Sequence, residues 1–439
     1  MQMSDSMKKI AEGEERIVRG QTMVLNETIE CKGRLIFENC VISSGADRAA
    51  AGILLGERAE LILRNCKVRC ERSEEDSYPR HSLVEIPDHC GGTVVCQETE
   101  FQDCYRFLET GEEASVLFES CLINNPSGDF CTLGWKNNRL DVQNCTIRLS
   151  GSRSTLSSVF SAILTGNTSH VKNCSIESSK AAEYLVLQLR DAEVEGCTFT
   201  GITGCIDGAA VIRKCEFRKC QQVIGYLHDS ETGAAISDCL FEQCEEVITN
   251  LPGQSTIANC RFTDCKDQII SNTDDSLMPG KPSDIRVESC RFSGLTGHEG
   301  GFSASLAFRR SVHGRGSVVK DCVFDGARLT EGFLLAGCGE HALRVETCEF
   351  LNCTADPHSG GIIQTRYGTD SAGSDDSFGG FIESVVVSNC RGLDSSEAGN
   401  GFKESFAMPD CEASCIKIAC LREKYGLQNE NADETLLTL

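Results

Sequence analysis

A short unit centred on cysteine recurs along this chain and constrains its fold more than any other feature. In each of fourteen copies an apolar residue lies three positions before the anchor residue, and in thirteen copies another lies two positions after it. The anchors are Cys40, Cys66, Thr99, Cys121, Cys145, Cys174, Cys197, Cys215, Cys239, Cys260, Cys290, Cys322, Cys348 and Cys390. A unit that returns this often along one chain is typical of a solenoid.

The residues next to the anchor predict the geometry of the unit. Along an unbroken strand, an apolar residue three positions before the anchor would face away from the apolar residue two positions after it. In nine copies the position just before the anchor holds Asn, Asp or Gly, which tolerate a left-handed backbone. These residues are Asn39, Asn65, Asn144, Asn173, Gly196, Asp238, Asn259, Asp321 and Asn389. We expect a one-residue bend there that turns both apolar columns inward.

The apolar columns predict a core of stacked thiol and phenyl groups. Seven successive copies carry Phe two positions after the anchor, and five copies carry a second Cys five positions after it. The second cysteines are Cys104, Cys220, Cys244, Cys265 and Cys353. We expect the most regular part of the core to contain Cys174, Cys197, Cys215, Cys239, Cys260, Phe199, Phe217, Phe241, Phe262 and Phe292.

Over residues 31–402 this pattern resembles the right-handed parallel β-helix of the pectate-lyase-like superfamily. There, an Asn-rich two-residue turn joins two short strands, and like residues stack from coil to coil. The resemblance implies an all-β chain, a single-stranded parallel β-helix solenoid of about 14 coils. We expect residues 1–30 to form an N-terminal arm or cap, with a short helix or arm over Asp5 to Arg16. We expect a C-terminal capping helix within residues 403–426 and a flexible acidic tail over residues 427–439.

Cysteine usage predicts the compartment. The chain has 28 cysteines, most of them in the repeat, and free Cys behaves as a small buried hydrophobe. Met1 to Gly20 is charged throughout and lacks a hydrophobic segment, so we expect reduced thiols in the cytoplasm. The clusters Cys411/Cys415/Cys420 and Cys66/Cys70 lack the paired spacing of a zinc ribbon. We therefore expect no metal, and we find no motif for a cofactor.

The charge and the long loops limit the kinds of partner. A formal net charge of −23 argues against direct binding to nucleic-acid phosphates or to anionic membranes. Four loops outgrow the coil, at residues 71–92, 272–284, 309–316 and 368–380, and loops are where such a scaffold carries its function. The candidate binding residues on them are Tyr78, His81, His89, Arg309, Arg310, His313, Arg315, Asp370, Asp375 and Asp376.

The resemblance also implies a test for catalysis, because polysaccharide lyases and hydrolases share this fold. The segments around Asp274 and His298 look similar to those of polygalacturonase-type hydrolases, but Glu299 interrupts the second one. A lyase would need acids that bind calcium, such as the three aspartates of residues 368–380, and an arginine base. The catalytic candidates are Asp274, Asp275, His298, Arg309 and Arg310, and their spacing does not tie them into one set.

Three classes of function follow from the sequence. We favour a non-catalytic, cytoplasmic β-helix scaffold that presents loops or a flat strand face to a protein partner. The second class is a polysaccharide lyase or glycoside hydrolase that acts on a saccharide in a loop-walled groove. The third is an acidic mimic of nucleic acid, which clustering of the acids along one face would favour and an even scatter would not. The partner's identity, the side from which the loops project and the oligomeric state stay open.

Overall fold

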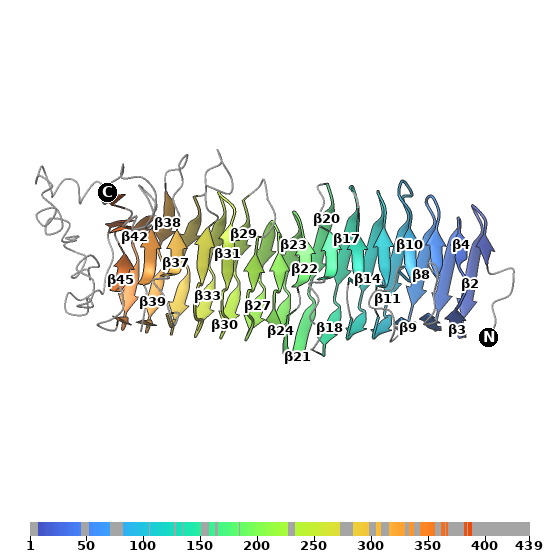
Figure 1. Ribbon diagram of the computed structural model, residues 1–439, viewed down its shortest axis with the longest axis horizontal. Coiled ribbons are helices and arrows are strands. Elements are labelled where there is room, and N and C mark those ends of the chain that lie inside the picture. The colour runs from blue at the N-terminus through green and yellow to red at the C-terminus, as the bar shows by residue number, and fades with distance from the viewer. Residues whose placement is uncertain are drawn as a thin grey trace, which may run out of the picture. The chain divides into compact units, whose positions relative to one another are not determined.

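The computed structural model describes most of the chain up to residue 388 (Figure 1). The chain divides into two compact units. Unit 1 is Met1–Glu216 and unit 2 is Phe217–Leu439. The described residues are 8–44, 52–70, 82–104, 106–126, 129–134, 136–150, 158–162, 166–183, 185–226, 233–272, 284–297, 304–308, 316–329, 333–337, 343–355, 361–364, 366–367, 382–383 and 385–388.

Unit 1 is built from three parallel sheets, and successive strands along the chain go to sheets A, B and C in turn. Sheet A contains β1 (Lys9–Ile10), β4 (Ile29–Cys31), β7 (Ile53–Leu55), β10 (Val84–Ile86), β13 (Leu108–Thr110), β16 (Cys131–Leu133), β19 (Ser158–Ala162), β22 (Leu185–Leu189) and β25 (Ile206–Asp207). Sheet B contains β2 (Glu15–Arg19), β5 (Arg34–Glu38), β8 (Glu60–Arg64), β11 (Thr93–Gln97), β14 (Ser115–Glu119), β17 (Arg139–Gln143), β20 (Thr168–Lys172), β23 (Glu193–Glu195) and β26 (Val211–Arg213). Sheet C contains β3 (Thr22–Leu25), β6 (Val41–Ser44), β9 (Lys67–Cys70), β12 (Glu100–Gln102), β15 (Leu122–Asn124), β18 (Thr146–Leu149), β21 (Ser175–Glu183) and β24 (Thr198–Thr203).

Unit 2 repeats the same plan. Its sheet A contains β28 (Ile224–Gly225), β31 (Ile248–Leu251), β34 (Ile270–Asn272), β37 (Ala304–Phe308), β41 (Phe333–Gly337) and β45 (Gly361–Gln364). Its sheet B contains β29 (Ala235–Ser237), β32 (Thr256–Ala258), β35 (Arg286–Glu288), β38 (Ser317–Lys320), β42 (Leu343–Glu346) and β48 (Val385–Ser388). Its sheet C contains β27 (Glu216–Arg218), β30 (Leu240–Glu242), β33 (Arg261–Thr263), β36 (Arg291–Ser293), β39 (Val323–Asp325) and β43 (Glu349–Leu351). Two short pairs complete the strands, β40 (Arg328–Leu329) with β44 (Thr354–Ala355) and β46 (Arg366–Tyr367) with β47 (Ile382–Glu383).

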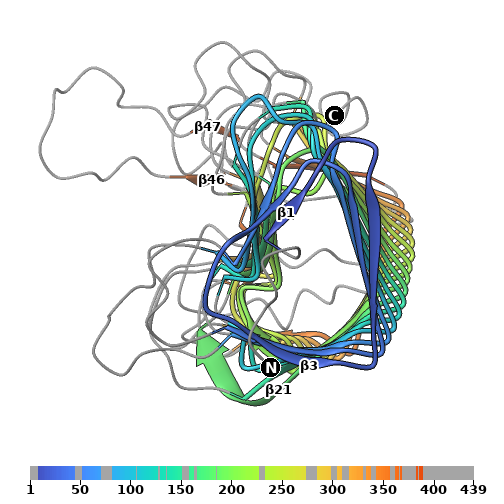
Figure 2. The ribbon, with the colours of Figure 1, turned by 90° about the vertical axis from the view of Figure 1, so that its right-hand side faces the viewer.

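The strand order confirms the predicted solenoid. Within each unit a strand pairs in parallel with its counterpart one coil later, as β5 pairs β8 and β8 pairs β11. The coils of unit 1, blue to green in Figure 2, therefore have three sides, one from each sheet. The described residues form no helix, and so none that could cross a membrane.

The predicted bend before the anchor is present. Asn39, Asn65, Asn144 and Asn173 all have φ between 49 and 55°. The same conformation occurs at types that do not favour it, such as Ser120 and Lys214, with φ of 55 and 54°. Because L-residues pay a steric cost for this conformation, the stacking of neighbouring coils must impose it at those positions.

The predicted core of thiol and phenyl groups is also confirmed. The anchor thiols of the described residues are at most 2% exposed. Most of them lie near a backbone carbonyl oxygen of the preceding coil, as Cys174 Sγ lies 3.6 Å from Val142 O. In unit 2 the phenyl rings stack with centroids 4.7–4.9 Å apart and interplanar angles of 5–9°. The rings in that stack are Phe217, Phe241, Phe262, Phe292, Phe324 and Phe350.

The N-terminal segment differs from the prediction of an arm or cap over residues 1–30 with a short helix or arm over Asp5 to Arg16. The described part of residues 1–30 contains β1, β2, β3 and the start of β4, so the coils begin well before residue 31. The first coil follows the repeat, with Val18 before and Met23 after the bend at Gly20, but Gln21 replaces the anchor cysteine. A pattern centred on cysteine therefore missed it. The predicted C-terminal helix and acidic tail lie outside the described residues.

Candidate functional site

Among the loop and catalytic residues predicted from the sequence, only His89 lies within the described residues. It has a left-handed backbone, with φ of 62°, and its Nδ1 lies 3.1 Å from Glu112 Oε2 at the surface. The others lie outside the described ranges, namely Tyr78, His81, Asp274, Asp275, His298, Arg309, Arg310, His313, Arg315, Asp370, Asp375 and Asp376. Candidate sites must therefore be built from the outer faces of the coils themselves.

The outer face of sheet B in unit 1 carries a central column of aliphatic residues, each four positions before its anchor. Although Ile36 and Ile62 point outward, they are only 4% and 5% exposed. Val95 and Leu117 further along are half-buried. The column comprises Ile17, Ile36, Ile62, Val95 and Leu117 in register.

Ladders of paired charges flank this column. On one side the Arg34 guanidinium lies 2.9 Å from a Glu15 carboxylate oxygen and 2.8 Å from one of Glu60. On the other side the Glu38 carboxylate lies 2.7 Å from Arg19 and 3.4 Å from Arg64. The hydrogen bond from Arg19, with a contribution from Arg64, lowers the pKa of the Glu38 carboxyl. The ladders keep long side chains beside the column, which explains the low exposure of Ile36 and Ile62.

Beyond Leu117 the central column turns polar and brings together Asp141, His170 and Glu193. These three residues are in register on β17, β20 and β23. The buried Asp141 carboxylate lies 2.9 Å from His170 Nδ1 through one oxygen and 2.7 Å from Arg139 Nε through the other. When the Nδ1–H group of His170 donates the hydrogen bond to Asp141, Nε2 is left as a hydrogen-bond acceptor.

Sequence reasoning missed this cluster because its members are 29 and 23 residues apart. The signal that could have found it is the repeat itself, since each residue lies four positions before its anchor, at Cys145, Cys174 and Cys197. The residues that the structure describes contain no group of three or more side chains able to hold a metal ion. The cluster offers His170 Nε2 as a hydrogen-bond acceptor for a partner.

The outer face of sheet A in unit 1 carries a polar row. Glu85 and Glu109 are direct partners on adjacent strands, and the row continues in register across four further strands. Its later members become covered, with Ser161 at 8% and Asp207 at 2% exposure. The full row is Glu85, Glu109, Thr132, Ser161, Gln188 and Asp207. Carboxylates, hydroxyls and an amide in one line are the groups that hydrogen-bond a polar ligand.

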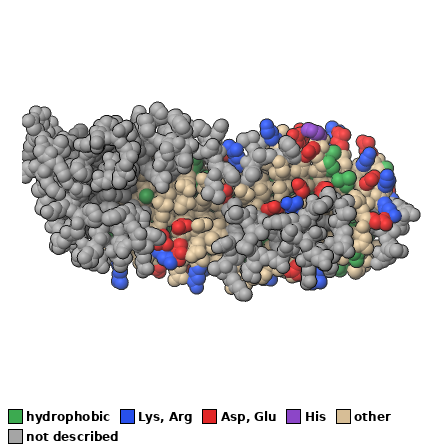
Figure 3. Space-filling model, in the orientation of Figure 1, with side chains coloured by type: hydrophobic (Ala, Val, Ile, Leu, Met, Phe, Trp, Pro, Cys, Tyr) green, Lys and Arg blue, Asp and Glu red, His purple; other side chains and the backbone are tan. Residues whose placement is uncertain are grey.

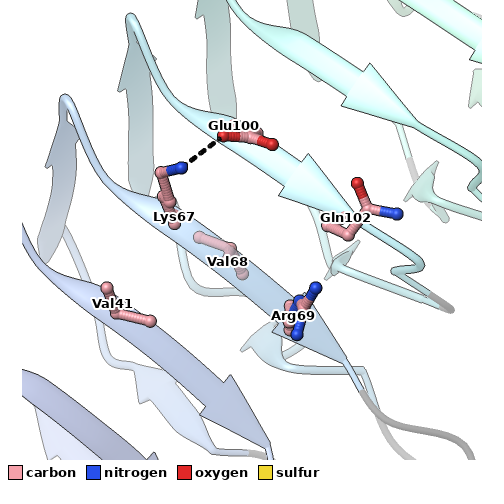
Figure 4. Close-up of a pocket in the computed structure, with 6 residues that line it drawn as sticks. All are labelled: Val41, Lys67, Val68, Arg69, Glu100 and Gln102. Atoms are coloured by element: carbon pink, nitrogen blue, oxygen red, sulfur yellow. Dashed lines mark ion pairs between the residues drawn. The ribbon is translucent and has the colours of Figure 1, made fainter.

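The outer face of sheet C in unit 1 has a shallow groove of about 240 Å³ (Figure 4). It crosses β6, β9 and β12, and Lys67 on its edge lies 3.1 Å from Glu100. The residues that line it are Val41, Lys67, Val68, Arg69, Glu100 and Gln102.

Comparison with known proteins agrees with the fold. The family described as "Right handed beta helix region" matches residues 161–373. The coil order and this match show that the chain has the fold of a right-handed parallel β-helix. A search of curated proteins found no match.

Several solved structures are similar to this chain at low identity. The catalytic domain of a GH87 α-1,3-glucanase in complex with tetrasaccharides has a TM-score of 0.35 and 11% identity, and the match covers 88% of this chain and 65% of that one. PfbA, a surface adhesin of Streptococcus pneumoniae, has a TM-score of 0.33 and 12% identity over 81% of this chain and 85% of that one. The A-module of a mannuronan C-5 epimerase from Azotobacter vinelandii has a TM-score of 0.27 and 9% identity over 86% and 90%.

Proposed function

We propose that the protein is a non-catalytic β-helix scaffold that presents the outer face of sheet B in unit 1 to a protein partner. The observation that carries the proposal is the centre of this face, where Val95 and Leu117 are half-buried neighbours. The uncharged Thr93 and Ser115 lie on one side of them, and on the other side Gln97 donates a hydrogen bond to Glu119 at 2.8 Å. Paired charges lie on either side of this centre along the face. An apolar centre with a polar rim is the usual anatomy of a protein interface.

The charged residues on either side of the apolar centre form its rim. They support the same function because they are already paired with one another. Arg34 bridges Glu15 and Glu60, and Arg213 lies 2.9 Å from Glu195. Side chains held in place before binding lose less conformational entropy when a partner docks. Basic and acidic side chains nearly match in number on this face, so the net charge of −23 is not concentrated there.

The distribution of charge also bears on the mimicry of nucleic acid. On sheet B of unit 1 the acids alternate with bases, and in Figure 3 the described acidic and basic side chains lie interspersed on the face in view. A mimic needs a continuous acidic face, so this pattern favours the scaffold. The proposal includes a cytoplasmic location, because a reducing compartment suits columns of thiols that neighbour one another in register.

The experiment is affinity capture with cross-linking in the native cell, using the full chain and two matched variants. Leu117→Arg places a charge at the centre of the sheet B face, whereas Leu122→Arg places the same charge on the outer face of sheet C, on the next strand along the chain. We expect Leu117→Arg to lose a cross-linked partner that both the wild type and Leu122→Arg retain. Retention of the partner by Leu117→Arg would contradict the proposal.

A second candidate function is action on a saccharide along sheet A, which the pair Glu85 and Glu109 favours. Adjacent parallel strands are about 4.8 Å apart, and retaining glycosidases hold their two carboxyl groups about 5–5.5 Å apart. Turnover of a panel of polyuronates and neutral glucans tests it, with Glu109→Gln as the variant. Glu30→Gln is the control on the same face, since Glu30 is paired with Lys9. If the wild type and Glu30→Gln turn over a substrate and Glu109→Gln does not, the saccharide function replaces the scaffold proposal.

A further inference from the structure

The groove on sheet C exists because neighbouring long side chains lean away from Val41. The Lys67 ammonium lies 3.1 Å from Glu100, one coil further on. The Gln102 amide donates a hydrogen bond to the Asp103 carboxylate at 2.8 Å. The Val68 side chain points into the core and is 0% exposed, so backbone forms the floor between these residues.

The groove has an aliphatic edge. Val41 is 38% exposed, and Val24 on the neighbouring strand is 42% exposed. The register places Thr22 opposite Val41 and Val24 opposite Ser43, so the two valines are diagonal neighbours on one face. The large exposed aliphatic side chains of the described residues are Ile17, Val24, Val41 and Leu351, and two of them meet here.

The groove also has a positive charge that no described residue compensates. Arg69 is exposed, is in register with Ser43 and Gln102, and makes no ion pair or side-chain hydrogen bond within the described part of the chain. Lys67 is neutralised by Glu100, so the groove carries one net positive charge in a chain whose net charge is −23. An exposed guanidinium binds a carboxylate through two parallel hydrogen bonds.

We propose that this groove binds an acidic segment of a partner protein in which an aliphatic residue lies next to an Asp or Glu. The partner's carboxylate pairs with Arg69, and its aliphatic side chain covers Val24 and Val41. The charge match selects an acidic segment, and the exposed valines add apolar area that the segment removes from water. This site is on sheet C and does not depend on the sheet B face, so each proposal can fail alone.

The test uses saturation-transfer NMR on the full chain with a blocked tetrapeptide of sequence Leu-Glu-Leu-Asp. The control peptide, Leu-Gln-Leu-Asn, has the same shape without the carboxylates. We expect saturation transfer to the leucine methyl groups, and about tenfold weaker binding for the control peptide, the loss typical of a charge-assisted hydrogen bond. This comparison uses the wild-type protein and needs no folded variant.

Two variants locate the site. Arg69→Gln removes the charge in the groove, and Arg148→Gln removes an arginine of the same outward column on β18, where Arg148 lies 2.9 Å from Glu177. We expect about tenfold weaker binding by Arg69→Gln and unchanged binding by Arg148→Gln. Equal binding of both peptides, no saturation transfer to either, or full binding by Arg69→Gln would each overturn the proposal.

Discussion

The Thr99 hydroxyl oxygen lies 3.3 Å from the carbonyl oxygen of Leu63, one coil earlier, and 3.0 Å from that of Gln97. The Cys121 thiol makes the equivalent contacts, at 3.3 Å to Cys96 and 3.4 Å to Glu119. Thr replaces Cys at this anchor without changing the contacts. The anchor therefore selects a small side chain with one donor, rather than the chemistry of a thiol.

This equivalence predicts the effect of two substitutions at Thr99. Thr99→Cys should change the free energy of unfolding by less than about 0.5 kcal/mol, while Thr99→Val should lower it by about 1 kcal/mol because the donor is lost. Chemical denaturation followed by circular dichroism measures both values. A Val variant as stable as the Cys variant would show that the hydrogen bonds contribute nothing.

Phe262 occupies the middle of the phenyl stack in unit 2. Its ring lies 4.7 Å from those of both Phe241 and Phe292, and the residue is 0% exposed. Phe262→Ala leaves a cavity in a fully packed column, so we expect it to lower the free energy of unfolding by about 3–5 kcal/mol. Phe262→Leu should cost clearly less. Equal losses in denaturant titrations would argue against a packing role for the ring.

Ser120 adopts a left-handed backbone that a serine does not favour, with φ of 55°. Asn tolerates this conformation, and it occupies the corresponding bend at Asn144 in the next coil. We expect Ser120→Asn to raise the free energy of unfolding by about 0.5–1 kcal/mol. Ser115→Asn, on strand β14, is the control and should bring no gain. A loss of stability in Ser120→Asn would contradict the steric argument.

Burial of the anchor thiols predicts that the folded protein becomes less stable at alkaline pH. Desolvation raises the pKa of the Cys66 thiol to about 11 from an ordinary value of 9.0. Below pH 9 the thiol is protonated in both states, so its full contribution to stability is present. Between pH 9 and 11 the unfolded chain loses the proton while the folded chain keeps it, so stability falls as the pH rises. A difference of two pKa units between the folded and unfolded states corresponds to a loss of about 2.7 kcal/mol in the free energy of unfolding.

Cys66→Thr supplies the comparison, because Thr99 shows that the anchor position accepts a hydroxyl. The variant should lose less stability between pH 9 and 11 than the wild type, by about 2–3 kcal/mol. Denaturant titrations at a series of pH values measure the difference. Parallel curves for the two proteins would refute the assignment of the effect to Cys66.

Arg16 places a charge at an inward position of the first described strand of sheet B. It is in register with the fully buried Leu35, and its guanidinium pairs with Glu14. Inward charges at a strand edge discourage pairing with another chain. We therefore expect Arg16→Leu to increase self-association in sedimentation experiments. Arg19→Leu, which changes an outward position of the same strand, should not.

The repeat was sufficient to predict the described coils from Cys40 onward, because each copy contains its own bend position and its own two inward residues. It failed for the coil before that, where Gln21 stands at the anchor and Arg16 at an inward position. The segment from Asp5 to Arg16, which is rich in Lys, Ala and Glu, suggested a short helix or an arm there. Tertiary packing overrode that local preference, since β2 gains a full parallel ladder with β5.

The candidate sites were harder to predict than the coils. Asp141 and His170 are separated by 29 residues and belong to no known motif, and the charge ladders combine residues from three or more coils. The loops that sequence reasoning chose as binding sites stay predictions, and so does His89, whose Nδ1 lies 3.1 Å from Glu112 Oε2.

The sequence by itself determined the inward face, because a column of Cys and Phe at fixed spacing can be buried in only one way by coils of this kind. Only the tertiary structure decided the outward face. Which Arg meets which Glu, and whether an outward isoleucine is covered or exposed, depends on the register of neighbouring coils and on loops of unequal length between them. Local spacing specifies the inward columns, but contacts between side chains far apart in the chain form only once the coils have stacked.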